Sequence, residues 1–371
     1  MSSAQQRLNQ VSSHFGGKKG AAGITEKHPD DIVVTCALRT ALTKGGKGGF
    51  KDTAAADLLA GVFKAVINKS GIDPKVVEDI AVGSTAAVKS LNRQCSSGLQ
   101  AIVDIANAVQ SGMIDVGIGA GVESMSSQYG PGAVTEFSEL LESHPESANC
   151  KVPMGVLRPS RPRRLASSTR RSPPLDVKWT DPKTGEEKTI TVKADDGIRE
   201  GITAESLGKI RPAFAKDGSI HAGNASQISD GAAAVLLMKR STAERLGQKI
   251  IGKYVSASVV GVKPLLMGVG PWASIPLALE KAGITKDDVD IYEINEAFAS
   301  QCVWCVNELG LPQEKINPKG GAIAFGHPLG CTGSRQVSTL LTELHRTNKK
   351  VGVTSMCVGT GMGMAAVWVA E

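Results

Sequence analysis

The sequence has 371 residues, enough for two domains or one large one, and 41% are hydrophobic, enough to bury a real core. No apolar run reaches the roughly 18 residues that a membrane helix needs, so we expect no membrane span and no membrane partner. The net charge of +6 comes from residues 157–173, which contain six Arg and no acid, and the rest of the chain is neutral; this pattern argues against a nucleic-acid-binding surface.

The first 29 residues are polar and rich in Gly and Lys, which predicts a disordered arm. Within it, Arg7-Leu8 and His14-Phe15 are separated by five residues. This spacing resembles the type-2 peroxisomal targeting signal, a short amphipathic helix that an import receptor reads. The seven Cys are scattered without framework spacing, which indicates reduced thiols in an intracellular compartment.

A first series of α/β elements follows the arm. Residues 127–221 have polar clusters and few clear periods, so we expect an irregular insertion there. The predicted elements of this first series are strand 31–36, helix 53–69, strand 80–83, a strand-like stretch 88–91, a helix after Cys95, strand 116–121 and, beyond the insertion, strand 230–238.

A second series repeats the first. Gly71–Ile80 is echoed by Gly283–Ile291, and Cys95-Ser-Ser-Gly-Leu-Gln-Ala by Cys331-Thr-Gly-Ser-Arg-Gln-Val. Two similar βαβ-type halves packed as a pseudo-dimer place a site in the cleft between them. The predicted elements of the second series are strand 253–262, helix 275–282, strand 291–294, helix 296–309, helix 331–345, strand 351–357 and strand 365–369.

The repeat also reveals a difference in length. Ile80 precedes Cys95 by 15 residues, whereas Ile291 precedes Cys331 by 40. The first half has therefore lost about 25 residues before Cys95, enough for a helix and its connections.

Four segments carry candidate chemistry. Cys95 lies at a strand-to-helix turn, where unpaired amides and the helix dipole favour a thiolate; the alternative is a buried Cys that acts as a small hydrophobe. His327 lies between Gly and Pro in a loop that a ligand can approach. Asn295 and Glu296 end a strand, and Cys357 precedes glycines whose amides are free to bind an anion.

Two further patterns resemble binding motifs but are better explained without a ligand. Cys302-Val-Trp-Cys305 has the spacing of a metal or redox motif, but it lies on an apolar helix without a second ligand pair, so we interpret it as core packing. Gly359-x-Gly361-x-Gly363 is a weak nucleotide-binding signal, because no helix or acidic partner follows it.

Taken together, these segments resemble the thiolase family, most closely its peroxisomal 3-ketoacyl-CoA branch. The resemblance covers most of residues 30–156 and 190–371. It rests on NRQCSSG, GVESM, AGNAS, NEAFA, GGAIAFGHPLGCTG and CVGTGMG. It implies a layered α-β-α-β-α fold made of an arm (1–29), an N-terminal half (30–126 with 222–248), a truncated loop domain (127–221) and a C-terminal half (249–371).

The resemblance also implies roles. Cys95 would be the nucleophile that takes the acyl group, and Cys357 the acid/base that protonates the departing acetyl-CoA carbanion. His327 would take the proton of Cys95 and hold the thioester oxygen with a water fixed by Asn295, and the amides of Cys95 and Gly359 would form a second oxyanion hole. The residues expected to line the coenzyme A channel are Met154, Phe214, Ser226 and Phe298.

The implied reaction is thiolytic cleavage of 3-ketoacyl-CoA in peroxisomal fatty acid β-oxidation. Coenzyme A is a substrate there, no cofactor or metal is implied, and we expect a homodimer. Two alternatives stay open at this stage: an acetoacetyl-CoA thiolase that runs condensation, and a catalytically impaired variant that only dimerises.

The chain departs from the family at a second place. Residues 157–173 hold the Arg-rich segment where the family has helices rich in Ala, Lys and Gln. Codons for a family-like helix, read one base later, can give this segment, so we hypothesise that it is out of frame. Together with the shortening before Cys95, it predicts a chain of low solubility or low activity.

Overall fold

The fold is built around a path of eight strands. The computed structural model describes residues 20–85, 91–128, 173–199, 201–214 and 216–371. The strand order is β3-β4-β7-β1-β8-β11-β10-β9, with β2 beside β7 and a separate β5-β6 hairpin. The strands are β1 (Ile32–Arg39), β2 (Thr43–Lys44), β3 (Asp79–Gly83), β4 (Val116–Ser124), β5 (Leu175–Thr180), β6 (Glu187–Val192), β7 (Ser229–Lys239), β8 (Gly252–Gly261), β9 (Ile291–Ile294), β10 (Val351–Val358) and β11 (Met362–Ala370).

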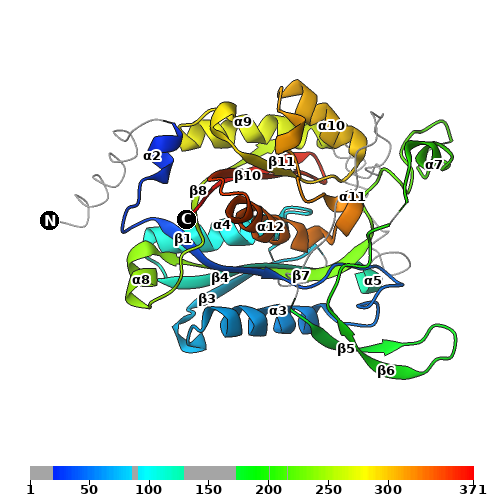
Figure 1. The fold of residues 1–371 in the computed structure, drawn as a ribbon, viewed down its shortest axis with the longest axis horizontal. Helices are drawn as coiled ribbons and strands as arrows, with labels where there is room; N and C mark the ends of the chain where they lie inside the picture. Colours follow the sequence, from blue (N-terminus) through cyan, green and yellow to red (C-terminus); the bar gives the residue numbers. More distant parts are fainter. Residues whose placement is uncertain (1–19, 86–90, 129–172, 200, 215) are drawn as a thin grey trace, which may run out of the picture.

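Helices cover both sides of the strands and also lie between them. Figure 1 shows five layers: α9 and α10, then β8 to β11, then α4 and α12, then β1, β3, β4 and β7, and finally α3. The predicted α-β-α-β-α arrangement is therefore confirmed. The helices are α2 (Ala21–Thr25), α3 (Ala55–Ser70), α4 (Ser97–Ser111), α5 (Met125–Gln128), α7 (Ala204–Gly208), α8 (Arg240–Arg245), α9 (Gly270–Ala282), α10 (Ala299–Glu308), α11 (Ala322–Phe325) and α12 (Thr332–Arg346).

The two halves repeat the same strand pairing. β3 runs parallel to β4, as β9 does to β10. β4 and β7 are antiparallel, as are β10 and β11, and β7 pairs with β1 as β11 pairs with β8. This identity of order and direction confirms the repeat predicted from the sequence. The residue limits proposed for the domains stay a prediction.

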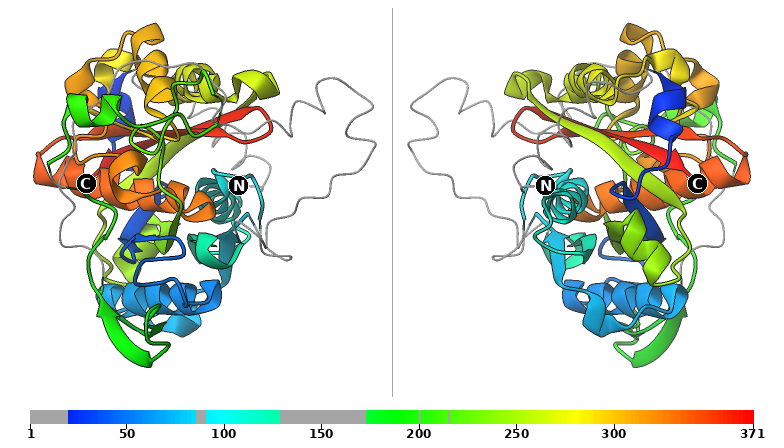
Figure 2. Two further views of the ribbon diagram at one scale, coloured as in Figure 1. Left: turned by 90° about the vertical axis from the view of Figure 1, so that its right-hand side faces the viewer. Right: turned by 90° about the vertical axis from the view of Figure 1, so that its left-hand side faces the viewer.

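The halves meet where β1 lies beside β8. Only two residue pairs join these strands, Val33 with Lys253 and Val34 with Gly252. Figure 2 shows β8, in yellow-green, running obliquely from one sheet layer toward the other. The sheet path is thus continuous in hydrogen bonding but sharply twisted at this junction.

The middle layer brings two helix N-termini together. An added Cβ at Gly98 of α4 would lie 2.5 Å from the carbonyl oxygen of Gly330, and one at Gly333 of α12 would lie 2.3 Å from the backbone nitrogen of Leu99. Because these glycines let the backbones approach so closely, the loop that begins α12 lies directly against the loop that begins α4. Both loops carry residues that the sequence singles out.

The apolar spacing after Cys95 explains why α4 forms and where it packs. Its buried apolar positions recur at three- and four-residue spacing and form a core cluster with Leu340 and Leu344 of α12. The helix ends at Gly112, which has a left-handed φ of 74°. The buried apolar residues of α4 are Leu99, Ala101, Ile102, Val103, Ile105, Ala106 and Val109.

The prediction of an irregular insertion is wrong for residues 175–192. They form the β5-β6 hairpin, which projects from the base of the N-terminal half (Figures 1 and 2). Apolar and polar residues do alternate in its strands, and Val177 and Val192 on one face are buried against the N-terminal half, although most of the other side chains are not buried. Cross-strand pairing also stabilises the hairpin. The ammonium groups of Lys51 and Lys188 lie over the Trp179 ring, 5.0 and 4.9 Å from its centroid.

The two halves differ before their middle-layer helices. Between β9 and α12 the chain forms α10 and α11, whereas the described residues between β3 and α4 contain no helix; residues 86–90 lie outside the description. β9 is completely buried, but Ile80 on β3 is 45% exposed. The outer edge of the N-terminal half thus lacks the cover that its counterpart has. Of the strand-like stretch predicted for 88–91, only Leu91 is described, in a single bridge to Gly83.

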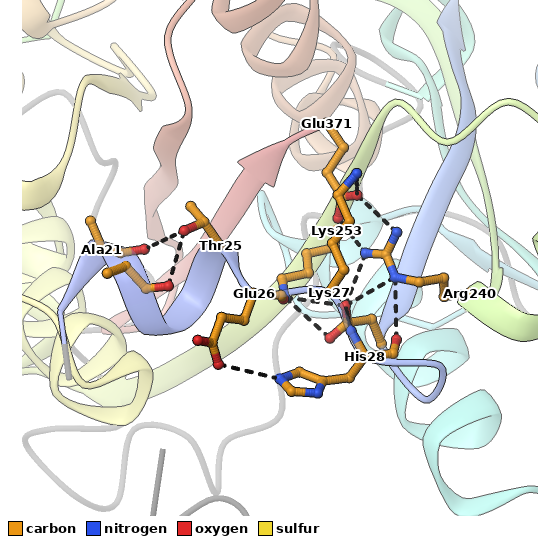
Figure 3. A network of polar contacts seen from close by, with 10 residues as sticks. Ala21, Thr25, Glu26, Lys27, His28, Arg240, Lys253 and Glu371 are labelled. Carbon is orange, nitrogen blue, oxygen red and sulfur yellow. Dashed lines mark hydrogen bonds and ion pairs between the residues drawn. The ribbon is translucent and has the colours of Figure 1, made fainter. Parts of the chain in front are cut away.

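A cluster of ion pairs joins the start of β1 to the end of the chain (Figure 3). Arg240 pairs with Asp31 at 2.9 Å and with Glu371, and Lys253 pairs with Asp31 at 3.1 Å. The side chain of Lys27 approaches Glu371 at 3.3 Å. Since Arg240 follows β7 and Lys253 lies on β8, the cluster connects the two halves beside the short β1-β8 junction.

Candidate active site

Cys95 lies in a tight turn immediately before α4. Gln94 adopts a left-handed φ of 46°, which is uncommon for a residue with a side chain and is typical of functional turns. The Ser97 hydroxyl accepts from the Arg93 amide at 2.9 Å and donates to the Gln94 carbonyl at 2.7 Å. This turn fixes the backbone on which Cys95 is held, with only 2% of the residue exposed.

The surroundings of Cys95 favour the thiol over the thiolate. Burial raises its pKa to about 11, although amides of Gly359 and of Cys95 itself work in the opposite direction; the charge of Glu123 raises it further. The expected stabilisation of the thiolate by the helix N-terminus is thus outweighed by the loss of solvent. A base must take the proton before the sulfur can attack.

His327 begins the loop that leads into α12, and its ring is held at both nitrogens. Gly326 before it has a φ of 109°, and an added Cβ there would lie 2.0 Å from the Ser229 hydroxyl. Nδ1 lies 2.6 Å from the Thr332 hydroxyl, and Nε2 lies 3.2 Å from Nδ2 of Asn295. Burial, followed by the charge of Arg335, lowers the pKa of His327 to about 3, so the ring is neutral near pH 7.

Asn295 follows β9 directly. Its backbone amide donates to the Ser355 carbonyl of β10 at 2.8 Å, which keeps the residue next to the strand that carries Cys357. Its Nδ2 faces His327, while its Oδ1 is buried and has no partner within the described part of the chain. A buried carbonyl oxygen of this kind is a suitable acceptor for one ordered water.

Cys357 and Gly359 complete the group from the end of β10. Cys357 is fully buried in an apolar cluster with Ile220, Met267 and Phe298, and burial raises its pKa well above the ordinary value. The charge of Cys95 acts in the same direction, as do those of Cys305 and Cys302 on α10. The side chains of this cluster give Cys357 apolar walls.

Five candidate residues from four separate segments are therefore connected. The Gly359 amide donates to the Cys95 sulfur, and the charge of Cys95 raises the pKa of Cys357. Asn295 binds β10 through its backbone amide and faces His327 with its side chain. These contacts link the segments that carry two thiols, one neutral imidazole and one side-chain amide where the halves meet.

Comparison with protein families matches both halves. The thiolase N-terminal domain matches residues 32–90, 83–171 and 176–241, and the thiolase C-terminal domain matches residues 248–370. The chain belongs to the thiolase family. It is thus an acyltransferase of the thiolase type, and the resemblance read from its motifs is confirmed.

Individual thiolases match over nearly their whole length. The peroxisomal 3-ketoacyl-CoA thiolase of Yarrowia lipolytica is 47% identical over 412 residues, covering 98% of this chain and all of the relative. The dimeric peroxisomal thiolase of Saccharomyces cerevisiae has a TM-score of 0.80 at 38% identity, covering 93% of this chain and 99% of that one. The acetyl-CoA acetyltransferase of Bacillus anthracis has a TM-score of 0.76 at 28% identity, covering 93% and 100%.

This thiolase is shorter than its relatives. The alignment with the Yarrowia protein extends over 412 positions, more than the 371 residues of this chain, so that relative has segments without a counterpart here. The match to the N-terminal domain breaks at residues 83–90, immediately before the Cys95 turn. The Arg-rich residues 157–172 lie outside the described residues, and the hypothesis of a shifted frame stays a prediction.

The residues predicted to line the coenzyme A channel fall into two groups. The Ser226 amide donates to the Ala297 carbonyl at 2.9 Å, and Ala225 bridges to Phe298, so this segment lies along the NEAFA loop. Phe214 packs edge-on against Phe298 with ring centroids 6.0 Å apart and is 45% exposed. Met154 lies outside the described residues.

Sequence reasoning missed two residues that hold the thiolase loops. The Gln227 carbonyl accepts from the His327 amide at 3.0 Å, and its side chain donates to the carbonyls of Gly197 and Ile323 at 2.8 and 3.1 Å. Thr332 contacts the His327 ring. Only its position near the start of a predicted helix, five residues after the His, could have drawn attention to it.

The CxxC pair lies in the interior. Cys302 and Cys305 are both buried on α10, and the Cys305 thiol donates to the Gly268 carbonyl at 3.4 Å. Within the described ranges, no group of three or more His, Cys, Asp or Glu side chains could hold a metal ion. No helix in that part of the chain is long and apolar enough to cross a membrane.

Proposed function

We propose that the chain cleaves 3-ketoacyl-CoA with coenzyme A to give acetyl-CoA and a shortened acyl-CoA, as in peroxisomal fatty acid β-oxidation. This proposal is supported by Cys95 lying next to the Gly359 amide, by Cys357 lying two residues before Gly359, and by Asn295 contacting both β10 and His327. Retro-Claisen cleavage needs a soft nucleophile, a base for it, and an acid for the carbanion that leaves. Cys95, His327 and Cys357 meet these needs.

In the first half-reaction, the Cys95 proton moves to Nε2 of His327 while the sulfur attacks the 3-keto carbon. The bond between the α- and β-carbons then breaks. Cys357 donates its proton to the acetyl-CoA carbanion, and the acyl group stays on Cys95 as a thioester. The amides of Cys95 and Gly359, and His327 with a water on Asn295, stabilise oxygen anions in the two steps.

In the second half-reaction, the thiol of free coenzyme A attacks the thioester on Cys95. Its proton passes to the Cys357 thiolate, Cys95 leaves as a thiolate and takes back its proton from His327, and the shortened acyl-CoA departs. Because the acyl-enzyme separates the two half-reactions, ping-pong kinetics are expected. Ser226, Phe214, Phe298 and Met154 are proposed to line the channel that delivers the pantetheine arm.

The test is thiolysis by the purified chain, with Cys95→Ala as the inactive control. We expect loss of 3-ketoacyl-CoA that depends on coenzyme A, and mass spectrometry should find acyl groups on Cys95 when coenzyme A is withheld. A rate that is the same for wild type and Cys95→Ala would overturn the proposal.

Two alternatives are separated by related measurements. An acetoacetyl-CoA thiolase would act on the four-carbon substrate and not on longer chains, so kcat/KM across chain lengths distinguishes it. The 28% identity to the Bacillus acetyltransferase, against 47% to the Yarrowia protein, favours the 3-ketoacyl branch. An impaired variant that only dimerises would leave Cys95 unacylated.

We further propose a homodimer in the peroxisome. The yeast structure at 38% identity is titled a dimeric peroxisomal thiolase, and the Yarrowia relative is named peroxisomal. Residues 7–15, proposed to bind the import receptor, lie outside the described residues. Light scattering tests the dimer. Fluorescence microscopy of the chain with Arg7→Asp tests the targeting signal, and unchanged peroxisomal import would contradict it.

A further inference from the structure

The inference concerns the proton on the His327 ring. The amide nitrogen of Asn295 lies 3.2 Å from Nε2, and an NH2 group can only donate. Nε2 must therefore carry a lone pair, and in the neutral ring the single proton then lies on Nδ1. A buried Nδ1–H needs an acceptor, because His327 is only 3% exposed.

The hydroxyl of Thr332 provides that acceptor. Its oxygen lies 2.6 Å from Nδ1, and its own proton points to the Pro328 carbonyl at 3.0 Å, four residues earlier. The same bond to the carbonyl four residues earlier recurs along α12 at Thr339, Thr342 and Thr347. A hydroxyl that donates its single proton in this way can only accept from the ring.

We propose that Thr332 is a positioning residue that holds the proton of His327 on Nδ1 and so keeps Nε2 free as the base for Cys95. When the Cys95 proton moves to Nε2, both ring nitrogens carry hydrogen and the ring becomes positive. Nδ1–H continues to donate to Thr332, so no rearrangement of the hydroxyl accompanies the transfer. Thr332 is completely buried and does not itself touch the reacting atoms.

The direct test is nuclear magnetic resonance of the full chain labelled with ¹⁵N in histidine, with the ring signals of His327 assigned by their loss in His327→Asn. We expect the wild-type ring to carry its proton on Nδ1. In Thr332→Val, which keeps the shape but removes the acceptor, the proton should move to Nε2, with the Asn295 amide turned so that its Oδ1 accepts it. A wild-type proton on Nε2, or an unchanged tautomer in Thr332→Val, would overturn the inference.

The kinetic test rests on the proposed function. Thr332→Val should lower kcat by roughly 10²-fold with little change in KM, because general-base assistance is lost while substrate contacts remain. Thr332→Ser should retain most of the rate, since the hydroxyl is kept. Thr342→Val is the matched control: it removes the same type of bond from α12 with no His attached, and its kcat should equal that of wild type.

The two tests separate this inference from the proposed function. If the chain shows no thiolysis but the tautomer shifts in Thr332→Val, the function is wrong and the assignment of Thr332 is right. Equal kcat for Thr332→Val and wild type would reject the positioning role. Should Thr332→Val fail to fold, Thr332→Ser compared with Thr332→Ala decides the same question, because both lose the methyl group and only one keeps the hydroxyl.

Discussion

Cys95 and His327 are each held in the neutral form by burial. Solvent exclusion raises the pKa of the thiol to about 11 and lowers that of the imidazole to about 3. In the resting pocket the thiolate–imidazolium pair is therefore disfavoured. Bound substrate can change this balance, because an oxyanion that forms against His327 stabilises its positive charge. Such a pocket protects the nucleophile from reagents until a substrate arrives.

This neutral resting state predicts slow alkylation of Cys95. Because the pKa is raised, the thiolate fraction is small at pH 7 and grows about tenfold per pH unit until the pH approaches 11. Iodoacetamide labelling of the Cys95 peptide, measured by mass spectrometry between pH 6 and pH 10, should rise throughout. Glutathione is the control and should level off near pH 9. A plateau for Cys95 at pH 7 would contradict the raised pKa.

At the scale of elements, the site depends on how closely two loops approach. An added Cβ at Gly330 would lie 2.6 Å from the Ser84 Cα, 2.8 Å from the Val122 carbonyl oxygen and 2.9 Å from that of Gly83. All three atoms belong to the backbone, so no side chain can rotate away. The Gly330 amide also donates to buried Glu123 at 2.9 Å. The position of the His327 loop is thus set by backbone contact.

Gly330→Ala is accordingly expected to damage both stability and activity. Relief of the clash requires a backbone shift that costs about 1–3 kcal/mol of unfolding free energy and displaces the loop that carries His327. Thermal unfolding and thiolysis of the variant would show both losses. In Gly208→Ala, where an added Cβ meets nothing within 4 Å, neither quantity should change. Wild-type stability in Gly330→Ala would mean that the loops are not in close contact.

The sequence predicted most of the elements but not all of the contacts between them. Periodicity located the helix after Cys95 and both series of strands, because their apolar faces are buried and regular. The β5-β6 hairpin escaped although its strands alternate apolar and polar residues, because each strand is only six residues long and lies within a polar stretch. The motifs located Cys95, His327 and Cys357, but the contacts of Thr332 and Gln227 arise only when loops from distant segments meet. The raised pKa of Cys357 also depends on walls that other elements supply.

At the scale of the whole molecule, the described residues cover the edge strand of the N-terminal half less completely than that of the C-terminal half. The C-terminal half buries β9 under α10, whereas β3 presents Ile80 and lacks a described helix at its edge. An exposed strand edge with apolar side chains favours association between chains. The shortening before Cys95 therefore concerns solubility as well as the support of the nucleophile.

We expect the chain to unfold at a lower temperature than the Yarrowia relative and to aggregate more readily. The reason is the edge of β3, where Ile80 is 45% exposed, and the alignment with the Yarrowia protein includes residues of that relative that have no counterpart here. Differential scanning fluorimetry and light scattering of the two purified proteins test this. Insertion of the relative's segment before Cys95 should restore solubility. Equal melting temperatures and equal thiolysis rates for both natural proteins would refute the expectation.

The ion-pair cluster predicts how stability changes in acid. Burial alone would raise the pKa of Glu371, but hydrogen bonds and charge from Arg240, with Lys27, outweigh it and the pKa is lowered. The stabilisation is present above the ordinary Glu pKa and is lost as the pH falls through the lowered value in the folded state. Glu371→Gln should cost about 1–3 kcal/mol at pH 7 and less below about pH 4.

Chemical denaturation at several pH values measures this difference. Asp115→Asn is the control, because the pair of Asp115 with Arg245 is mostly exposed at 3.8 Å and should contribute little. If the free energy of unfolding of wild type and of Glu371→Gln differed by the same amount from pH 7 to pH 3, the charge of Glu371 would not be the source of the stabilisation.

The short junction between β1 and β8 has a mechanical consequence. Two residue pairs and the neighbouring ion pairs connect the strand systems, while Cys95 comes from one side and His327, Asn295 and Cys357 come from the other. The packed faces of α4 and α12 also hold the halves together, so a change that loosened both this packing and the junction would separate the nucleophile from its base and its acid with each half still folded. The turnover rate of this thiolase therefore depends on how firmly the two halves are held together.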